Sequence, residues 1–370
     1  MDMEYSQQFI LNFSPLQFNL MACCAASDEP KEQTPIYQIP FTDRGNPEPS
    51  KIQRIVEDIV KACKGLGTDE KKLISVTGEC TGIERDAVSE LYTKTYNKTL
   101  HGLFKSELSG KFEKMFLAMY TTRYVFWAEQ IKEAVKGAGT DEKKLIDLLV
   151  STGSEYAEVD RVFTQLYKKC IYETLSSECG NSCWGKLMKA WITNKRVAGN
   201  AQTIAEKLHK AAKGAGTDEK TFIELLTTTD QQTYQQVDQE FSRAYKKELR
   251  QVIKAEFSGK AEYAFLAVHD YLIEPARFVA SMLKQAVKGC GTNDDKLIYT
   301  TALHAQNFAG TVQQAYESMG LGNLKKDLKS DLTGKQESPH YVVAAVSVFY
   351  FSNIFLLQFL QLKQLLFNVV

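Results

Sequence analysis

The chain has 370 residues, and its 45 basic and 45 acidic residues leave no formal net charge. This balance excludes the long-range attraction to nucleic acid or anionic lipid that a basic protein has. Binding to a negative surface would therefore need another source of positive charge. The eight cysteines include no CxxC pair, which argues against a disulfide framework or a zinc site and favours a reducing compartment.

Residues 1–49 contain six of the eight prolines and are predicted to form an irregular tail. The tail starts with MDMEYSQQFILNF, which carries acidic residues where a secretory signal would carry Lys or Arg. We therefore expect a cytoplasmic protein.

The first predicted helix follows the tail, and its apolar face is Ile52, Ile55, Val56, Ile59 and Val60. We expect Ser50 to cap the start of this helix and Gly65 to end it. Thr68 is the expected N-cap of a second helix, whose first turn holds acidic residues that favour the positive end of the helix dipole.

Three further helices complete this stretch. They are predicted over Arg85–Tyr96, over Leu100–Leu108 and after Gly110. No segment shows the alternation of a half-buried strand, so an all-α fold is predicted.

The sequence KGLGTDEKKLI, from Lys64 to Ile74, recurs three more times as KGAGTDEKKLI, KGAGTDEKTFI and KGCGTNDDKLI. The copies lie roughly 75 residues apart, too long for repeats of two helices, which run about 33 to 47 residues. We therefore predict four repeats of about five helices each. The predicted divisions are a tail at 1–49, repeats at 50–122, 123–198, 199–273 and 274–348, and a hydrophobic C-terminal extension at 349–370.

A carboxylate recurs downstream of this motif. Counting 42 positions from the first motif glycine reaches Glu107, Glu256 and Asp331 in the first, third and fourth repeats. The same count in the second repeat reaches Cys179, and Glu178 stands one place early.

A glycine loop with one remote carboxylate suits calcium. Ca²⁺ takes six to eight hard oxygens, and glycines let successive backbone carbonyls turn towards one centre. The loop stretch alone fits a structural helix corner equally well, and the downstream carboxylates favour the metal site.

Four repeats with K-G-x-G-T-[DN]-[ED] and a later [ED]-x-[ST]-G resemble the annexins over roughly residues 50–348. The resemblance implies a curved, disc-like α domain that binds calcium and acidic phospholipid. It implies as ligands the carbonyls of Cys63, Gly65 and Gly67 with Glu107, those of Val135, Gly137 and Gly139, those of Ala212, Gly214 and Gly216 with Glu256, and those of Val287, Gly289 and Gly291 with Asp331. It implies weaker secondary sites at Thr68 with Glu70, Thr140 with Glu142, Thr217 with Glu219, and Thr292 with Asp294.

The second repeat departs from this pattern. One residue along a helix turns a side chain by about 100°, so Glu178 is expected to miss an ion that a residue at position 179 would reach. We therefore leave open whether the second repeat binds calcium.

The chain ends in an uncharged run from Tyr341 to Leu362, YVVAAVSVFYFSNIFLLQFLQL, which is long enough to span a bilayer. Part of it must form the fifth helix of the fourth repeat, at about 335–348. The remainder could be an extra packed helix, a membrane anchor or a poorly determined gene end. We favour packing against the repeats, because polar residues interrupt the run.

The sequence favours calcium-dependent binding to acidic phospholipid membranes by a cytoplasmic, peripheral membrane scaffold, with Ca²⁺ as its only cofactor. Protein or cytoskeletal partners are expected at the N-terminal tail, and no nucleic acid. The alternatives are a helical-repeat protein that binds cytoskeletal or other proteins with little calcium dependence, and an integral membrane protein. No P-loop, HExxH, GxSxG or dinucleotide fingerprint is present, so we expect no enzyme.

Overall fold

A computed structural model describes residues 47–65, 67–137, 139–213, 216–287, 293–304 and 311–330. Within these ranges the regular elements are helices. One isolated β-bridge pairs Val197 with Thr229. None of the described helices has the length and hydropathy needed to cross a membrane. The proline-rich tail, Asp331, the expected last helix of the fourth repeat and the hydrophobic run lie outside the described residues.

Five α-helices form each of the first three repeats. The first contains α2 (Pro49–Ala62), α3 (Glu70–Gly78), α4 (Gly82–Tyr96), α5 (Leu100–Glu107) and α6 (Gly110–Met119). The second contains α7 (Arg123–Ala134), α8 (Glu142–Thr152), a 3₁₀ turn η2 (Gly153–Glu155), α9 (Tyr156–Tyr167), α10 (Ile171–Glu178) and α11 (Cys183–Thr193). The third contains α12 (Ala201–Ala211), α13 (Glu219–Thr228), α14 (Gln231–Tyr245), α15 (Leu249–Glu256) and α16 (Gly259–Ile273).

The fourth repeat is described through four helices, α17 (Pro275–Val287), α18 (Asp294–His304), α19 (Thr311–Ser318) and α20 (Leu324–Ser330). The predicted all-α architecture of helical repeats is therefore confirmed. The predicted helices of the first repeat are present, with boundaries that differ by one to three residues.

Three predicted caps were wrong. The first helix, α2, ends at Ala62, and its C-cap is Cys63 and not Gly65. Glu48, and not Ser50, precedes α2, because Pro49 occupies the first helical position, where its missing N–H costs nothing. Asp69, and not Thr68, caps α3, because its carboxylate accepts the N–H of Lys72. The hydroxyl of Thr68 is used elsewhere, as described below.

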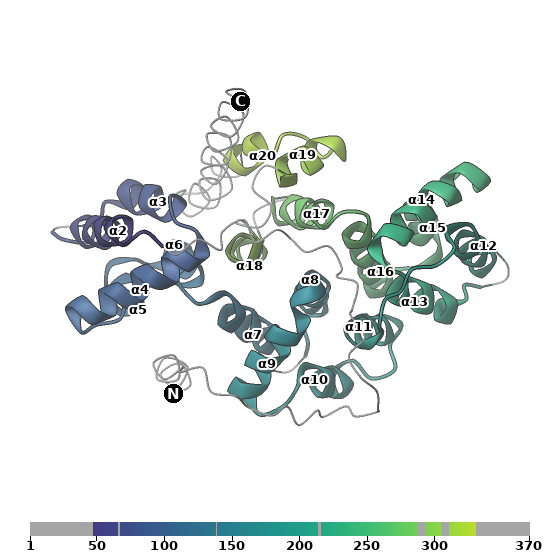
Figure 1. Cartoon of the computed structure of the whole chain (residues 1–370), viewed down its shortest axis with the longest axis horizontal. Helices are drawn as coiled ribbons and strands as arrows, with labels where there is room; N and C mark the ends of the chain where they lie inside the picture. Colours follow the sequence, from purple (N-terminus) through teal and green to yellow (C-terminus); the bar gives the residue numbers. More distant parts are fainter. Residues whose placement is uncertain are drawn as a thin grey trace, which may run out of the picture.

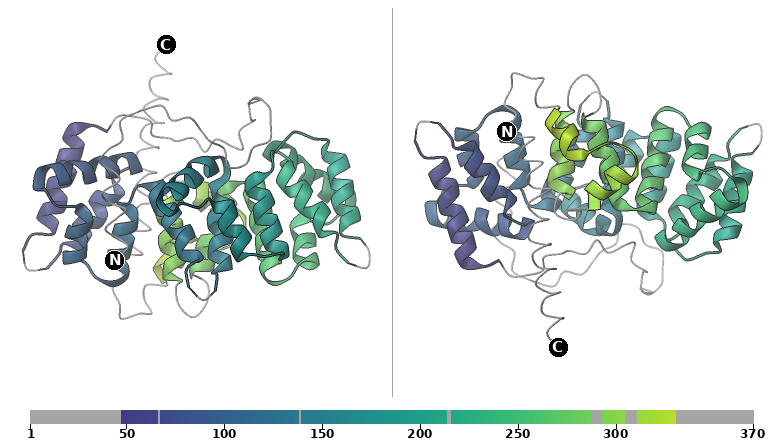
Figure 2. Two further views of the ribbon diagram at one scale, coloured as in Figure 1. Left: turned by 90° about the horizontal axis from the view of Figure 1, so that it is seen from below. Right: turned by 90° about the horizontal axis from the view of Figure 1, so that it is seen from above.

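The four repeats lie around a common centre (Figure 1). The side views place the first repeat at one end of the molecule and the third at the other, with helices of the fourth between them (Figure 2). The first repeat packs on the fourth through α6 and α18. The second packs on the third through three helix pairs, α8 with α16, α11 with α13 and α11 with α16.

A buried carboxylate joins three of the repeats. Asp147 on α8 is fully buried and forms an ion pair of 2.8 Å with Lys296 on α18. Its two oxygens also accept hydrogen bonds of 2.6 Å from the hydroxyls of Tyr263 on α16 and Tyr299 on α18. Because buried charges are costly without partners, this cluster fixes the second, third and fourth repeats relative to one another.

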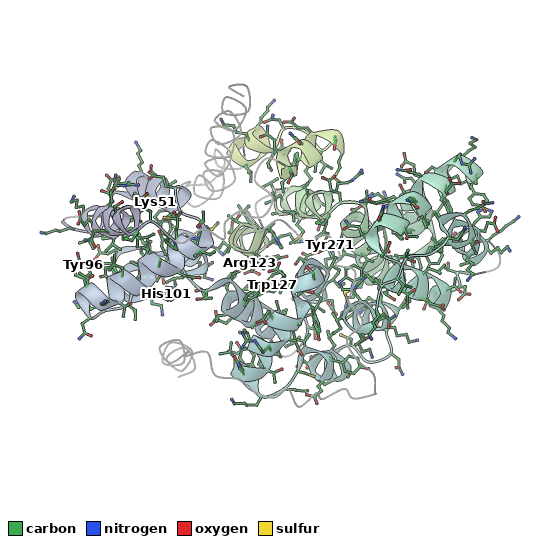
Figure 3. The ribbon with its side chains drawn as sticks, viewed as in Figure 1. Lys51, Tyr96, His101, Arg123, Trp127 and Tyr271 are labelled. Atoms are coloured by element: carbon green, nitrogen blue, oxygen red, sulfur yellow. The ribbon has the colours of Figure 1, made fainter. Side chains whose placement is uncertain are left out.

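Arg123 makes a second connection at the start of α7. It pairs with Glu155, and its Nε donates to the carbonyl of Leu303 on α18 at 3.0 Å. Its guanidinium also lies over the ring of Trp127, 4.8 Å from the ring centroid, near the middle of the molecule (Figure 3). Arg123 thus links the second repeat to the fourth, and its contacts with Glu155 and Trp127 lie within the second repeat.

Candidate metal sites in the interhelical loops

The repeated motif forms the loop between the first two helices of each repeat, and one backbone hydrogen bond closes this loop in all four. The donor is the N–H of Asp69, Asp141, Asp218 or Asn293, and the acceptor is the carbonyl of Ala62, Ala134, Ala211 or Ala286, at 2.8, 2.8, 2.9 and 2.7 Å respectively. The side chain of the same residue then caps the following helix. The Asp or Asn that follows the loop threonine therefore closes the loop and caps the next helix.

The loop glycines adopt backbone angles that other residues resist. Gly65 and Gly67 have φ of 124° and 91°, and the described glycines of the next loops, Gly137, Gly139 and Gly216, have 105°, 129° and 119°. A Cβ at any of these positions would meet no atom within 4 Å. Backbone conformation, and not lack of space, therefore requires glycine here.

In the first and third repeats the downstream carboxylate residue is the last residue of a helix and is tied to the loop. The Thr68 hydroxyl donates to the Glu107 carbonyl at 3.1 Å. The Thr217 hydroxyl lies 3.3 Å from the Glu256 carbonyl and 2.6 Å from its Oε2. Burial, and after it the charge of Glu107, raises the pKa of the Cys63 thiol to about 11, so the carboxylate acts on the residue that precedes the loop.

The second repeat differs from the sequence-based expectation, because Glu178 and not Cys179 occupies the position of Glu107 and Glu256. Glu178 is the last residue of α10, as the other two are of α5 and α15. The Thr140 hydroxyl donates to its Oε2 at 3.1 Å. All three helices are eight residues long, but α10 starts one residue earlier relative to its loop, so the expected 100° rotation does not arise.

Cys179 corresponds to the buried apolar residue that follows the acid. Leu108, Cys179 and Phe257 are each 7% exposed. Burial raises the pKa of the Cys179 thiol to about 11, so the side chain is a protonated, apolar filler and not a thiolate ligand.

A closer marker in the sequence could have located Glu178. A Tyr-[Asn/Lys]-Lys turn precedes these helices, and its middle residue, Asn97, Lys168 or Lys246, adopts a left-handed conformation. Counting ten positions from that residue gives 107, 178 and 256. The longer count from the glycine crosses two helices and a variable turn, where single-residue length changes accumulate.

The proposed secondary acids meet different partners. Glu142 pairs with Lys260, and its hydrogen bond with this lysine lowers the pKa of the Glu142 carboxyl. Asp294 pairs with Lys111 at 3.6 Å. Burial, and after it the neighbouring Glu219, raises the pKa of the Cys183 thiol to about 12.

The remaining predicted residues are placed only in part. Glu70 begins α3, Val135 follows α7, and Ala212 follows α12. Val287 is the last residue of α17. Five predicted ligands lie outside the described residues: Gly214, Gly289, Gly291, Thr292 and Asp331.

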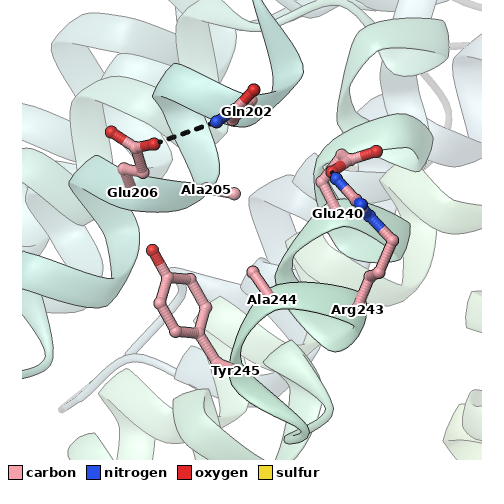
Figure 4. Close-up of a pocket in the computed structure, with 7 residues that line it drawn as sticks. All are labelled: Gln202, Ala205, Glu206, Glu240, Arg243, Ala244 and Tyr245. Atoms are coloured by element: carbon pink, nitrogen blue, oxygen red, sulfur yellow. Dashed lines mark hydrogen bonds and ion pairs between the residues drawn. The ribbon is translucent and has the colours of Figure 1, made fainter.

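The described residues offer no competing site. They contain no cluster of three His, Cys, Asp or Glu side chains arranged to hold a metal. A hollow of about 60 Å³ lies between α12 and α14 and is lined by Gln202, Ala205, Glu206, Glu240, Arg243, Ala244 and Tyr245 (Figure 4). It is far smaller than the roughly 300–1,000 Å³ of a typical small-molecule pocket.

A family model described as Annexin matches residues 56–119, 126–191 and 203–268, one segment in each of the first three repeats. The chain is 34% identical over 287 residues to Annexin A7 of Dictyostelium discoideum, an alignment that covers 75% of this chain and 62% of that protein. It is 31% identical over 292 residues to human Annexin A3, with coverage of 76% and 89%. The match to human Annexin A11, at 32% identity, spans only 57% of that longer protein.

Solved structures of similar fold cover most of the chain. Annexin III superposes with a TM-score of 0.72 at 28% identity and covers 83% of this chain and 96% of that one. The calcium-bound structure of alpha-14 giardin superposes with a TM-score of 0.73 at 26% identity, with coverage of 81% and 99%.

Proposed function

Because the chain belongs to the annexin family, whose members are generally calcium-dependent phospholipid-binding proteins, we propose that it binds acidic phospholipid membranes through calcium held in its interhelical loops. The family's members are generally binding proteins without enzymatic activity, and we propose the same here. The protein would act as a peripheral scaffold or organiser at the cytoplasmic face of membranes.

The observation that carries this proposal is the link between loop threonine and acidic residue. In three repeats the hydroxyl at the end of the glycine loop reaches Glu107, Glu178 or Glu256 at the end of a remote helix. Carbonyl and carboxylate oxygens are the hard ligands that calcium takes, and glycines with positive φ free the loop backbone to present its carbonyls. The donor set present therefore fits Ca²⁺ better than a soft metal.

The residues that would hold the ion are the carbonyls of Cys63, Gly65 and Gly67 with Glu107, those of Ala212, Gly214 and Gly216 with Glu256, and those of Val287, Gly289 and Gly291 with Asp331. The bound ion would supply the positive charge that a chain of zero net charge lacks. Since calcium takes six to eight oxygens, positions would be left for lipid phosphate or water.

We further propose that the second repeat takes part, with Glu178 joining the carbonyls of Val135, Gly137 and Gly139. The support is its hydrogen bond with Thr140, which matches the bond between Glu256 and Thr217. This extends the sequence-based expectation, which left the second repeat open.

Co-sedimentation with phosphatidylserine vesicles tests the proposal. We expect the full chain to pellet with vesicles in millimolar calcium and to stay in the supernatant in excess chelator. Magnesium should substitute poorly, because it demands a tight octahedron and gives up its waters reluctantly. Equal pelleting in chelator and calcium would overturn the proposal.

A matched pair of variants ties the result to the loops. The double variant Glu107→Gln with Glu256→Gln should raise the calcium concentration needed for half-maximal pelleting. The control Glu57→Gln removes an exposed acid from α2 and should leave it unchanged. An equal shift in both would mean that overall charge, and not the loop carboxylates, governs binding.

A further inference from the structure

The start of the last helix in one repeat contacts the start of the second helix in another. Lys111, at the start of α6, pairs with Asp294 on α18, and Lys260, at the start of α16, pairs with Glu142 on α8. The pair α6 with α18 packs the first repeat on the fourth, and α16 with α8 is one of the pairs that pack the third on the second. Each lysine thus reaches across a boundary between repeats to an acid two residues after a loop threonine.

In the second repeat a cysteine stands where the other two have lysine. Burial fixes the alignment, because Met115 and Phe116 of α6 correspond to Leu187 and Met188 of α11, all buried. Stepping back four residues from Met115 and Leu187 reaches Lys111 and Cys183. Cys183 is the first residue of α11 and Glu219 the first residue of α13, and these two helices pack together across the boundary between the second and third repeats.

A lysine and a cysteine have different effects on a neighbouring carboxylate. A lysine ammonium cancels the negative charge that attracts a divalent cation, and the pair must separate before the carboxylate can become a ligand. A thiol carries no such charge and forms no ion pair with a carboxylate. A cysteine carries no positive charge in either protonation state, so Cys183 leaves the charge of Glu219 in place.

We propose that Lys260 and Lys111 are internal competitors of divalent cations at Glu142 and Asp294, and that Cys183 leaves Glu219 open as the secondary acid of the third repeat. This inference rests on the proposed function, because it concerns which loop acids accept calcium. It adds to the expected secondary sites a difference between repeats that is set by contacts across repeat boundaries.

The expected effect is modest because the pairs are partly exposed. Lys260 and Glu142 have 53% and 26% of their side chains accessible, and Lys111 and Asp294 have 41% and 18%. Ion pairs at such positions change an equilibrium by at most about fivefold. Removing the lysine should therefore strengthen the weaker class of calcium binding by roughly two- to fivefold.

Calorimetric titration of the full chain with calcium tests the proposal. It compares a variant that lacks the lysine and a variant that gains one with the unaltered chain. Lys260→Met should strengthen weak calcium binding, whereas Lys207→Met, a change of an exposed lysine on α12, should not. Cys183→Lys should weaken binding at Glu219, and Cys183→Ser, which keeps an uncharged donor, should leave it unchanged. No effect of Lys260→Met, or of Cys183→Lys, would overturn the proposal.

A Glu142→Gln background separates a specific effect from a general charge effect. If Lys260 acts by occupying Glu142, Lys260→Met should change nothing further in that background. An equal gain in both backgrounds would overturn the proposal. Unfolding in chelator gives a readout without metal, since the double-mutant cycle between positions 260 and 142 should show coupling there as well. Failure of the unaltered chain to bind calcium would instead overturn the proposed function.

Discussion

Replacing Asp147 by asparagine tests whether the central polar cluster holds the repeats together. The change keeps the shape of the side chain but removes its charge. In the native fold the carboxylate is fully buried and has three close partners, Lys296 at 2.8 Å and the hydroxyls of Tyr263 and Tyr299 at 2.6 Å each. The asparagine amide has one acceptor oxygen, so it cannot satisfy all three.

The expected loss of stability depends on how well Lys296 is satisfied once the carboxylate is gone. Breaking one side of a buried ion pair costs about 3–5 kcal/mol, because the other charge stays buried without its partner. Lys296 retains two neutral acceptors, the Tyr263 hydroxyl at 2.8 Å and Gln285 Oε1 at 2.9 Å. We therefore expect the lower end, a loss of about 3 kcal/mol in the free energy of unfolding.

Urea unfolding followed by far-ultraviolet circular dichroism measures this loss. Asp295→Asn is the matched control, because Asp295 is also paired with a lysine, Lys144 at 2.9 Å, but 55% of its side chain is exposed. Its change should cost less than about 1 kcal/mol. If Asp147→Asn cost no more than Asp295→Asn, the idea that this cluster fixes the repeats would be refuted.

Three further predictions concern the loops and the core. Glu178→Gln should raise the calcium needed for half-maximal vesicle sedimentation while Cys179→Ala leaves it unchanged, and equal shifts would contradict the register assigned to α10. Gly67→Ala should lower the free energy of unfolding by about 1–2 kcal/mol, measured in urea, because φ is 91° there and a side chain resists that conformation. Burial lowers the pKa of His269 from 6.5 to about 4, so its contribution to stability is present above pH 6.5 and is lost as the pH falls towards 4. His269→Gln should therefore flatten the pH dependence of urea unfolding in that window, and an unchanged slope would show that other groups cause it.

The sequence by itself determined the repeats and their helices. Apolar spacing is local, so the buried face of α2, with Ile52, Ile55, Val56 and Ile59, could be predicted before any contact was known. The caps were less certain, because neighbouring Thr68 and Asp69 can both cap a helix. The choice depends on the backbone hydrogen bond from Asp69 to Ala62, which fixes where the loop ends and α3 begins.

Only the tertiary structure decided which residues face each loop. The register of α10 depends on the chain length of the helices before it, so a count along the sequence reached Cys179 while the folded chain presents Glu178. The pair between Lys111 and Asp294 depends on the packing of the first repeat against the fourth. Such contacts join residues far apart in the chain, and no local pattern of apolar or charged residues specifies them.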